Sequence, residues 1–220
     1  MRTEIPFDHW LKLIFDHEID ERLPEWYFQP DAETEPVDPP TYIKYSTTLF
    51  RNSVELLRPY SEIQMYQGLN VLISNCVSNN ILALQDKAIP LEDRLAFINA
   101  IFDLNQQTFE TRCTPHLSHL DRHSTPPEVS PLNMICYMWW DVSITPGREL
   151  NEACLSVMEN CLQLTNPAVL EGALHGLGHW TRSYPKRCEQ AIDTFLKKRA
   201  KQLSQALRTY AMAAATGCIQ

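Results

Sequence analysis

The chain has 220 residues, of which 44% are hydrophobic and 21% are charged, and these values exclude a chain that is disordered throughout. Nineteen basic residues against 27 acidic ones give a net charge of −8, which opposes non-specific binding to nucleic acid or to an anionic membrane surface. Glycine is scarce, with six residues, which argues against an all-β chain rich in tight turns. We expect one helical domain over residues 1–220.

The compartment is predicted from what the sequence lacks. The first ten residues have no apolar core of the kind found in signal peptides, and no stretch approaches the ~18 apolar residues of a membrane span. The seven cysteines are scattered and contain no CxxC pair. These features predict buried free thiols in a cytoplasmic protein.

Residues 1–40 divide into a helix and an acidic segment. Apolar residues in 6–17 fall on one helical face. The segment 18–40 holds five prolines, which oppose helix formation, and only one basic residue. Its acids carry nearly all of the net charge and could form an arm for a basic protein partner: Glu18, Asp20, Glu21, Glu25, Asp31, Glu33, Glu35 and Asp38.

Irregularly spaced helices are predicted over residues 41–148. Ser61 and Gln64 match a capping box at the start of one helix. Pro90 opens a second helix, which should end near Cys113. After a polar connection at 114–130, Pro131 begins a helix that is apolar nearly all round and is therefore expected to be buried.

Paired helices are predicted over residues 149–220. Asn166-Pro167 and Tyr184-Pro185 each mark a helix start, and a further helix is expected to open at Lys201. The connections are short, so neighbouring helices should pack antiparallel. No strand-like alternation of useful length occurs in the chain.

The paired helices of 149–216, with the stretch NPAVLEGALHGLGHW as an inner helix, resemble HEAT-like α-helical repeats. That resemblance implies a curved helical-hairpin array, an α-solenoid or α-α superhelix, with a surface for binding peptides or proteins. The stretches RCTPHLSHLD, NMICYMWWD and ALHGLGHW also resemble those of a set of uncharacterised bacterial proteins, which implies a bacterial source and no particular activity.

The predicted helix 167–182 is the best candidate for a binding groove. Glu171, His175 and His179 follow one another at four-residue spacing, outside the apolar arc of the helix. Gly172 and Gly176 are also four residues apart, and their lack of a Cβ permits close approach by another helix or a ligand. The candidate groove residues are Glu171, His175, His179, Trp180, Trp139 and Trp140, although both tryptophans of the pair 139–140 can equally fill the core.

Histidines at i and i+4 on a helix can bind one metal ion, as His175 and His179 could. A second dense group of ligand-type residues lies in 113–123. If the two groups converge, the candidate metal ligands are His116, His119, His175, His179, Cys113 and Asp121. The alternatives are structural hydrogen bonds made by these histidines and a surface that binds a partner.

Several other motifs are absent or weak. There is no GxGxxG, Walker A, GxSxG or HExxH motif. Basic residues are frequent in 184–209 but have few aromatic residues between them, so a solvated outer helix face is favoured over a nucleic-acid patch. The acidic segment could lie over this basic end.

Three function classes remain open. The first is a non-enzymatic protein-binding module that needs no cofactor, in the form of a bacterial immunity or antitoxin-like protein that occludes a basic partner. The second is a metal-dependent hydrolase or oxygenase that uses zinc or iron, with Glu171 or Asp121 as the base. The third is a homodimeric scaffold.

Overall fold

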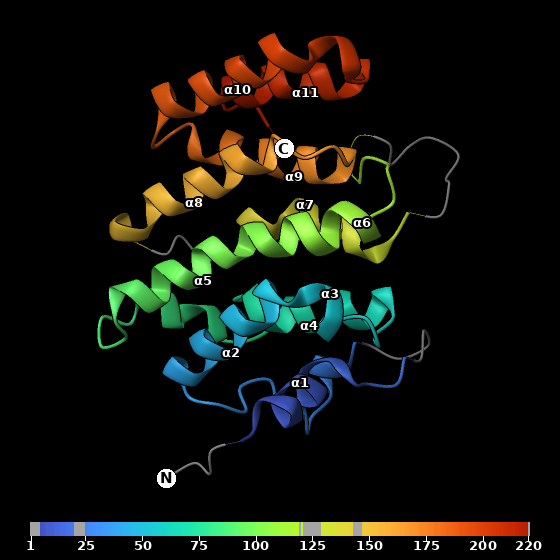
Figure 1. Ribbon diagram of the computed structural model, residues 1–220, viewed down its shortest axis with the longest axis vertical. Coiled ribbons are helices and arrows are strands. Elements are labelled where there is room, and N and C mark those ends of the chain that lie inside the picture. Colours follow the sequence, from blue (N-terminus) through green and yellow to red (C-terminus); the bar gives the residue numbers. More distant parts are fainter. Residues whose placement is uncertain (1–4, 20–24, 119, 121–128, 143–146, 220) are drawn as a thin grey trace.

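The computed structural model is all-α and describes residues 5–19, 25–118, 120, 129–142 and 147–219 (Figure 1). Its α-helices are α1 Phe7–Phe15, α2 Pro39–Arg51, α3 Ser53–Leu56, α4 Glu62–Ile73, α5 Leu91–Leu104, α6 Glu110–Arg112, α7 Pro131–Val142, α8 Arg148–Cys161, α9 Pro167–Trp180, α10 Pro185–Arg199 and α11 Gln205–Ala215. Short 3₁₀ segments lie at Trp26–Phe28, Asn80–Gln85 and Ala200–Gln202, and a π-helical turn spans Asn105–Phe109. The described residues contain no strand, as the sequence pattern predicts.

The helices stack in chain order along the long axis, from α1 at one end to α10 and α11 at the other (Figure 1). One row of contacts runs through α1, α4, α7, α9 and α11, and a second runs through α2, α5 and α8. α8 also packs on α9, which joins the two rows. α7 and α9 therefore lie inside the stack, with neighbours on several sides.

Local sequence signals set most helix starts. Ser61 and Gln64 form both hydrogen bonds of a capping box, and the Asn166 side chain accepts a hydrogen bond from the Ala168 amide. α5 follows Pro90 as predicted, and its π-helical turn and α6 carry the helix on to Arg112. The predicted start at Lys201 is wrong, because the Ser204 side chain caps α11 three residues later.

The described residues of the acidic segment, 18, 19 and 25–40, do not lie over the basic end of the chain, contrary to one expectation. Its residue Glu35 accepts hydrogen bonds from the backbone and side chain of Asn79, and Thr34 accepts one from Asn80. These contacts hold the described part of the segment near α4, whereas α10 lies at the opposite end of the stack (Figure 1). The order in which the helices stack keeps the acidic segment and α10 apart, and the charge pattern of the sequence does not reveal that order.

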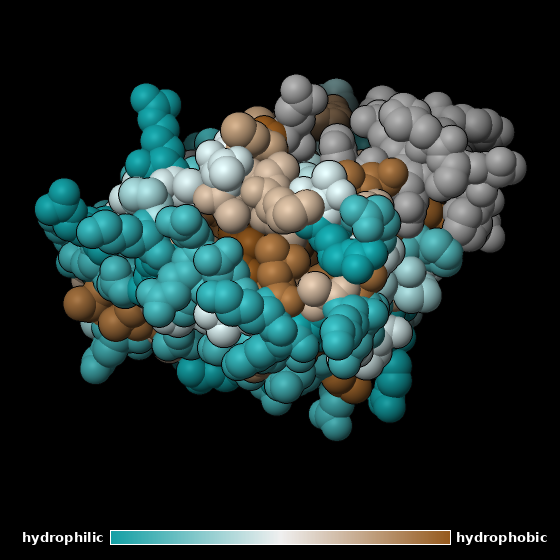
Figure 2. Space-filling model, turned by 90° about the horizontal axis from the view of Figure 1, so that it is seen from above, coloured by the Kyte–Doolittle hydropathy of each residue, from teal (hydrophilic) through white to brown (hydrophobic). Residues whose placement is uncertain are grey.

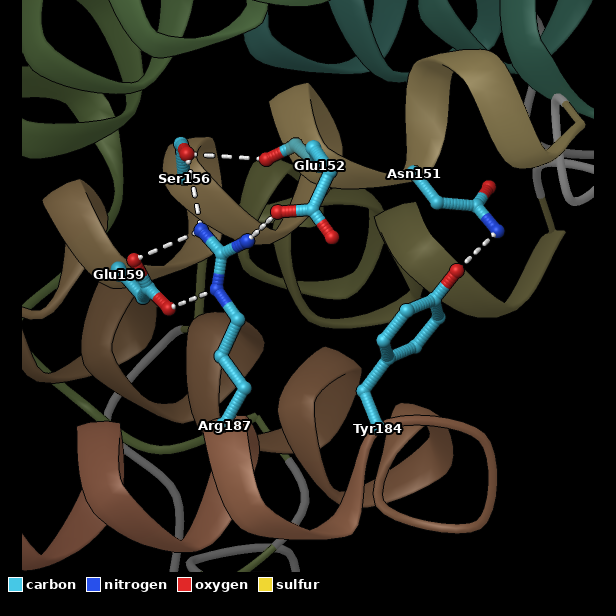
Figure 3. Close-up of polar contacts among 6 residues, drawn as sticks. All are labelled: Asn151, Glu152, Ser156, Glu159, Tyr184 and Arg187. Atoms are coloured by element: carbon cyan, nitrogen blue, oxygen red, sulfur yellow. Dashed lines mark hydrogen bonds and ion pairs between the residues drawn. The ribbon is translucent and has the colours of Figure 1, made fainter.

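Buried and half-buried arginines tie successive helices together. Arg94, which is 4% exposed, donates to the Glu149 carboxylate at 2.5 Å and to the carbonyls of Leu84 and Ile89. Arg187 of α10 donates to a cluster on α8 that comprises Glu152, Ser156 and Glu159 (Figure 3). Arg199 donates to the carbonyls of Leu162 and Leu164. Some of the basic residues of α10 therefore form hydrogen bonds and ion pairs within the fold.

The end face of the stack is mainly polar. Figure 2 shows the face at the α10–α11 end, where hydrophilic side chains surround a hydrophobic strip near the middle. Every helix in the described part of the chain is too short or too polar to cross a lipid bilayer.

Glycines set the separation between α7 and α9. A Cβ atom on Gly172 would lie 2.5 Å from the carbonyl oxygen of Cys136, and one on Gly176 would lie 2.7 Å from the Trp140 ring. No ordinary side-chain carbon is found so close to a backbone oxygen, so α7 can take its observed position only beside glycine. This confirms the close helix approach expected from the spacing of Gly172 and Gly176.

Replacing Gly172 by alanine should therefore destabilise the protein. A methyl group would push against the α7 backbone, and we expect Gly172→Ala to lower the free energy of unfolding by about 1–3 kcal/mol, despite the better helix propensity of alanine. Chemical denaturation measures this. Gly178→Ala is the control, because the three atoms nearest to its Cβ all belong to the Ile219 side chain and not to a backbone. An equal or greater loss in the control would contradict the account.

Candidate functional site

α9 carries two of the three residues that form the candidate site. The helix starts at Asn166 and Pro167 and is buried from Ala168 to Gly178. His175 and His179 lie one turn apart, and their Nε2 atoms approach to 3.1 Å. The i, i+4 spacing noted in the sequence thus brings the two imidazoles together at the end of the buried stretch.

α7 supplies the third residue. Asp141 lies in the last turn of this helix, directly after Trp140, whose ring packs against Gly176. Its Oδ1 atom is 3.6 Å from His179 Nε2. The glycine-dependent contact between α7 and α9 is what places this carboxylate beside the histidine pair.

Asp141, His175 and His179 therefore form a compact group of potential metal ligands. One ligand atom from each residue lies within 4.8 Å of the other two. His175 is 2% exposed, whereas the side chains of Asp141 and His179 are 41% and 39% exposed. The group sits at the boundary between the core and solvent, anchored on the His175 side and open on the other.

Two tyrosines surround the buried side of the group. Tyr210 of α11 places its Oη atom 2.7 Å from His175 Nδ1. Tyr137 of α7 lies with its ring centroid 4.1 Å from that of His175, and the two phenol oxygens are 3.4 Å apart. Burial raises the pKa of both phenols, which keeps them protonated at neutral pH.

Glu171, proposed from sequence as a groove residue or a base, has a structural position. It is fully buried, and its carboxylate accepts hydrogen bonds from the Ser118 amide and hydroxyl and from the Leu120 amide. Glu171 thus anchors the segment that follows α6 onto α9.

The second group of predicted ligands does not join the histidine pair where the structure describes it. Among the described residues, Asp141, His175 and His179 are the only three potential ligands that cluster, and neither Cys113 nor His116 belongs to this group. The His116 carbonyl accepts a hydrogen bond from Asn133, which ties this turn to α7. His119 and Asp121 lie outside the described residues.

The tryptophans divide between core and site. Trp139 is buried and makes edge contacts with Phe50 and Phe109, so it fills the core. Trp140 is half-buried against Gly176, next to Asp141. Trp180 stacks on Tyr184 at the end of α9 and is also half-buried.

The cysteines are mostly unreactive. Five are buried and free, and two, Cys76 and Cys218, are exposed. Burial raises the pKa of the Cys154 thiol to about 12 and that of Cys188 to about 11. A hydrogen bond with Cys113, together with burial, raises the pKa of Cys136. Such thiols are protonated at neutral pH and are poor nucleophiles.

Asp141, Tyr137 and Tyr210 were missed as site residues. Asp141 and Tyr137 stand in the stretch CYMWWD, where the sequence indicated only the two tryptophans as candidate site residues, and Tyr210 lies outside the motifs that the sequence offers. The sequence singles out the stretches around Asp141 and His179 separately. Only the packing of α7 and α11 on α9 shows that their side chains meet.

Comparison with known proteins provides no functional assignment. No protein-family model matches the chain, no curated protein matches it, and no solved structure matches it. The chemistry of the site therefore has to be argued from its own geometry.

Loss of charge at Glu171 should loosen the segment that it anchors. We expect Glu171→Gln to speed hydrogen exchange of the Ser118 and Leu120 amides about tenfold or more, since hydrogen bonds to charged groups contribute about 1.5–3 kcal/mol. Exchange measured by NMR tests this. Glu110→Gln is the matched control, because Glu110 binds the amides of Thr165 and Asn166 instead. Unchanged exchange at Ser118 and Leu120 in Glu171→Gln would refute the anchoring role.

Proposed function

We propose that the protein binds one zinc ion through Asp141, His175 and His179 and acts as a metal-dependent hydrolase. The convergence of three ligand atoms within 4.8 Å, from two helices held together by glycine contacts, carries this proposal. Imidazole and carboxylate are common ligands of zinc.

The distances suit a metal ion. Two ligand atoms that each lie ~2.0–2.1 Å from a tetrahedral zinc are about 3.3–3.4 Å apart. The separations of 3.1 Å between the histidine nitrogens and 3.6 Å from His179 to Asp141 differ from this by only a few tenths of an ångström. The third pair, Asp141 and His175, lies within 4.8 Å, so the exposed side chains of Asp141 and His179 would have to rotate to bring the three atoms onto one ion.

The exposure of the group supports a catalytic rather than a structural ion. Structural zinc sites are closed by four protein ligands, whereas catalytic sites have three and keep a position for water. Asp141 and His179 face solvent, so water can reach an ion held here. A bound zinc lowers the pKa of its water to about 7 and supplies a nucleophile for hydrolysis.

Iron would change the reaction class. Two histidines and one carboxylate with open positions also match the ligand set of non-haem iron oxygenases. The identity of the metal in the purified protein therefore distinguishes the hydrolase from the oxygenase.

One equivalent of zinc should bind to the metal-free wild-type protein. We expect the double variant His175→Ala, His179→Ala to lose stoichiometric binding, and Asp141→Ala to bind more weakly, because each removes a ligand. Elemental analysis after gel filtration and competition with a chromophoric chelator measure these effects. His9→Ala, which removes an exposed histidine of α1, is the control and should bind as the wild type does.

The coordination position that is left open for water can be tested separately. The cobalt-substituted protein should change its visible absorption spectrum when azide is added, because the anion can displace bound water. A wild type that binds no zinc contradicts the site. A cobalt spectrum that azide leaves unchanged contradicts the hydrolase.

A second candidate function is protein binding through the acidic segment. Phe28, in the middle of this segment, is 61% exposed, and Asp31 and Glu33 nearby are also exposed. Protein interfaces often have a central aromatic anchor surrounded by charged residues. Phe28 and its acidic neighbours have this arrangement. A HEAT-like array, which the sequence pattern predicts, would present such a binding surface. This candidate takes the form of a bacterial immunity-like protein that occludes a basic partner, or of a homodimer.

Two acids of the segment must stay in place in any test. Glu35 binds Asn79, and the Asp38 side chain caps α2 by accepting from the Thr41 amide, so their loss would disturb the fold. The acids to neutralise are Glu18, Asp20, Glu21, Glu25, Asp31 and Glu33.

The charge-neutral variant should associate about tenfold more slowly at low salt with a basic partner drawn from neighbouring gene products, and with a weaker salt dependence. Phe28→Ala should mainly speed dissociation. Stopped-flow mixing measures both rates, and solution mass identifies a homodimer. Unchanged rates in both variants would refute binding through this segment.

A further inference from the structure

The two nitrogens of His175 face different partners. Nδ1 lies 2.7 Å from Tyr210 Oη inside the protein, and Nε2 lies 3.1 Å from His179 Nε2 toward the open side. A neutral imidazole carries its hydrogen on one nitrogen and a lone pair on the other. Only the tautomer with the hydrogen on Nδ1 leaves the Nε2 lone pair available for a metal ion.

The geometry points to Tyr210 as the positioning residue of this site: its phenol oxygen accepts the Nδ1 hydrogen of His175, which aims the Nε2 lone pair at the metal position. The inference rests on the proposed function, because it assigns a metal-directed role to a residue that is not itself a ligand. Such second partners of ligating histidines fix the ring orientation and tautomer.

The carboxylate of Asp141 favours the same tautomer. Because it lies 3.6 Å from His179 Nε2, a hydrogen on that nitrogen is attracted to the negative charge in the metal-free protein. The same hydrogen then points toward His175 Nε2, which must accept it. The hydrogen of His175 therefore lies on Nδ1, where Tyr210 is placed to accept it.

The two histidines differ in how easily they rearrange. The His175 ring is 2% exposed and packs against the Tyr137 ring, so its orientation is set by the core. The His179 ring is 39% exposed, so water can carry its hydrogen from Nε2 to Nδ1 when a metal ion arrives. One ligand is thus preorganised and the other adapts.

Tyr137 supports this arrangement from α7. Its phenol oxygen is 3.4 Å from that of Tyr210, a longer contact than the one between Tyr210 and His175. Its ring also covers one side of the His175 ring. Removal of the Tyr137 hydroxyl should therefore affect metal binding less than removal of the Tyr210 hydroxyl.

Tyr210→Phe removes the hydroxyl and keeps the ring. We expect it to weaken zinc binding about 10- to 100-fold, the usual cost of losing such a partner. Tyr137→Phe should have a smaller effect. Tyr184→Phe is the matched control: its hydroxyl accepts a hydrogen bond from Asn151 and does not touch the site, so zinc affinity should not change (Figure 3).

A second readout does not require metal. Long-range ¹H–¹⁵N correlation spectra of the metal-free protein identify which nitrogen of His175 carries the hydrogen. The wild type should show the Nδ1–H form, and Tyr210→Phe should show a mixture of both tautomers. Thermal unfolding monitored by circular dichroism confirms that each variant is folded.

The possible results distinguish the proposed metal-dependent function from the positioning role of Tyr210. A wild type that binds no zinc overturns the proposed function, whatever the tautomer of His175. A wild type that binds zinc while Tyr210→Phe binds it equally tightly overturns only the role of Tyr210. An Nε2–H tautomer of His175 in the metal-free wild type also overturns that role.

Discussion

Close packing of α7 on α9 is the constraint on which the rest of the structure depends. Gly172 and Gly176 present no Cβ to α7, so the two helices approach until the Cys136 carbonyl and the Trp140 ring occupy the space that side chains would take. The helix pair sits between α4 on one side and α11 on the other. The same contact brings the last turn of α7, with Asp141, beside His179.

The site combines a rigid side and an adaptable side. His175 is buried among aromatic rings from α7 and α11, while His179 and Asp141 reach solvent. Glu171, one turn before His175, accepts hydrogen bonds from the segment after α6 and so fixes a neighbouring wall of the site. A site built this way has preorganised geometry on its buried side and access for water on its exposed side.

Local signals in the sequence predicted much of the fold. The capping box at Ser61 and the helix starts at Asn166 and Pro131 are short-range effects, and the structure confirms them. The histidine pair was also predicted, because four-residue spacing on a helix is a local property. The approach of Asp141 and Tyr210 was not, since it depends on which helices pack together and at what distance. Lys201 was expected to open α11, but the helix begins after Ser204, whose side chain caps it.

Zinc-edge X-ray absorption of the zinc-loaded protein tests the central claim most directly. The account predicts first-shell nitrogen and oxygen atoms at ~2.0–2.1 Å, with outer-shell scattering from two imidazole rings and no sulfur at ~2.3 Å. The scattering of both rings should disappear in the variant lacking His175 and His179. Zinc bound through sulfur, or a wild-type spectrum that the double variant reproduces, would contradict a metal site at Asp141, His175 and His179.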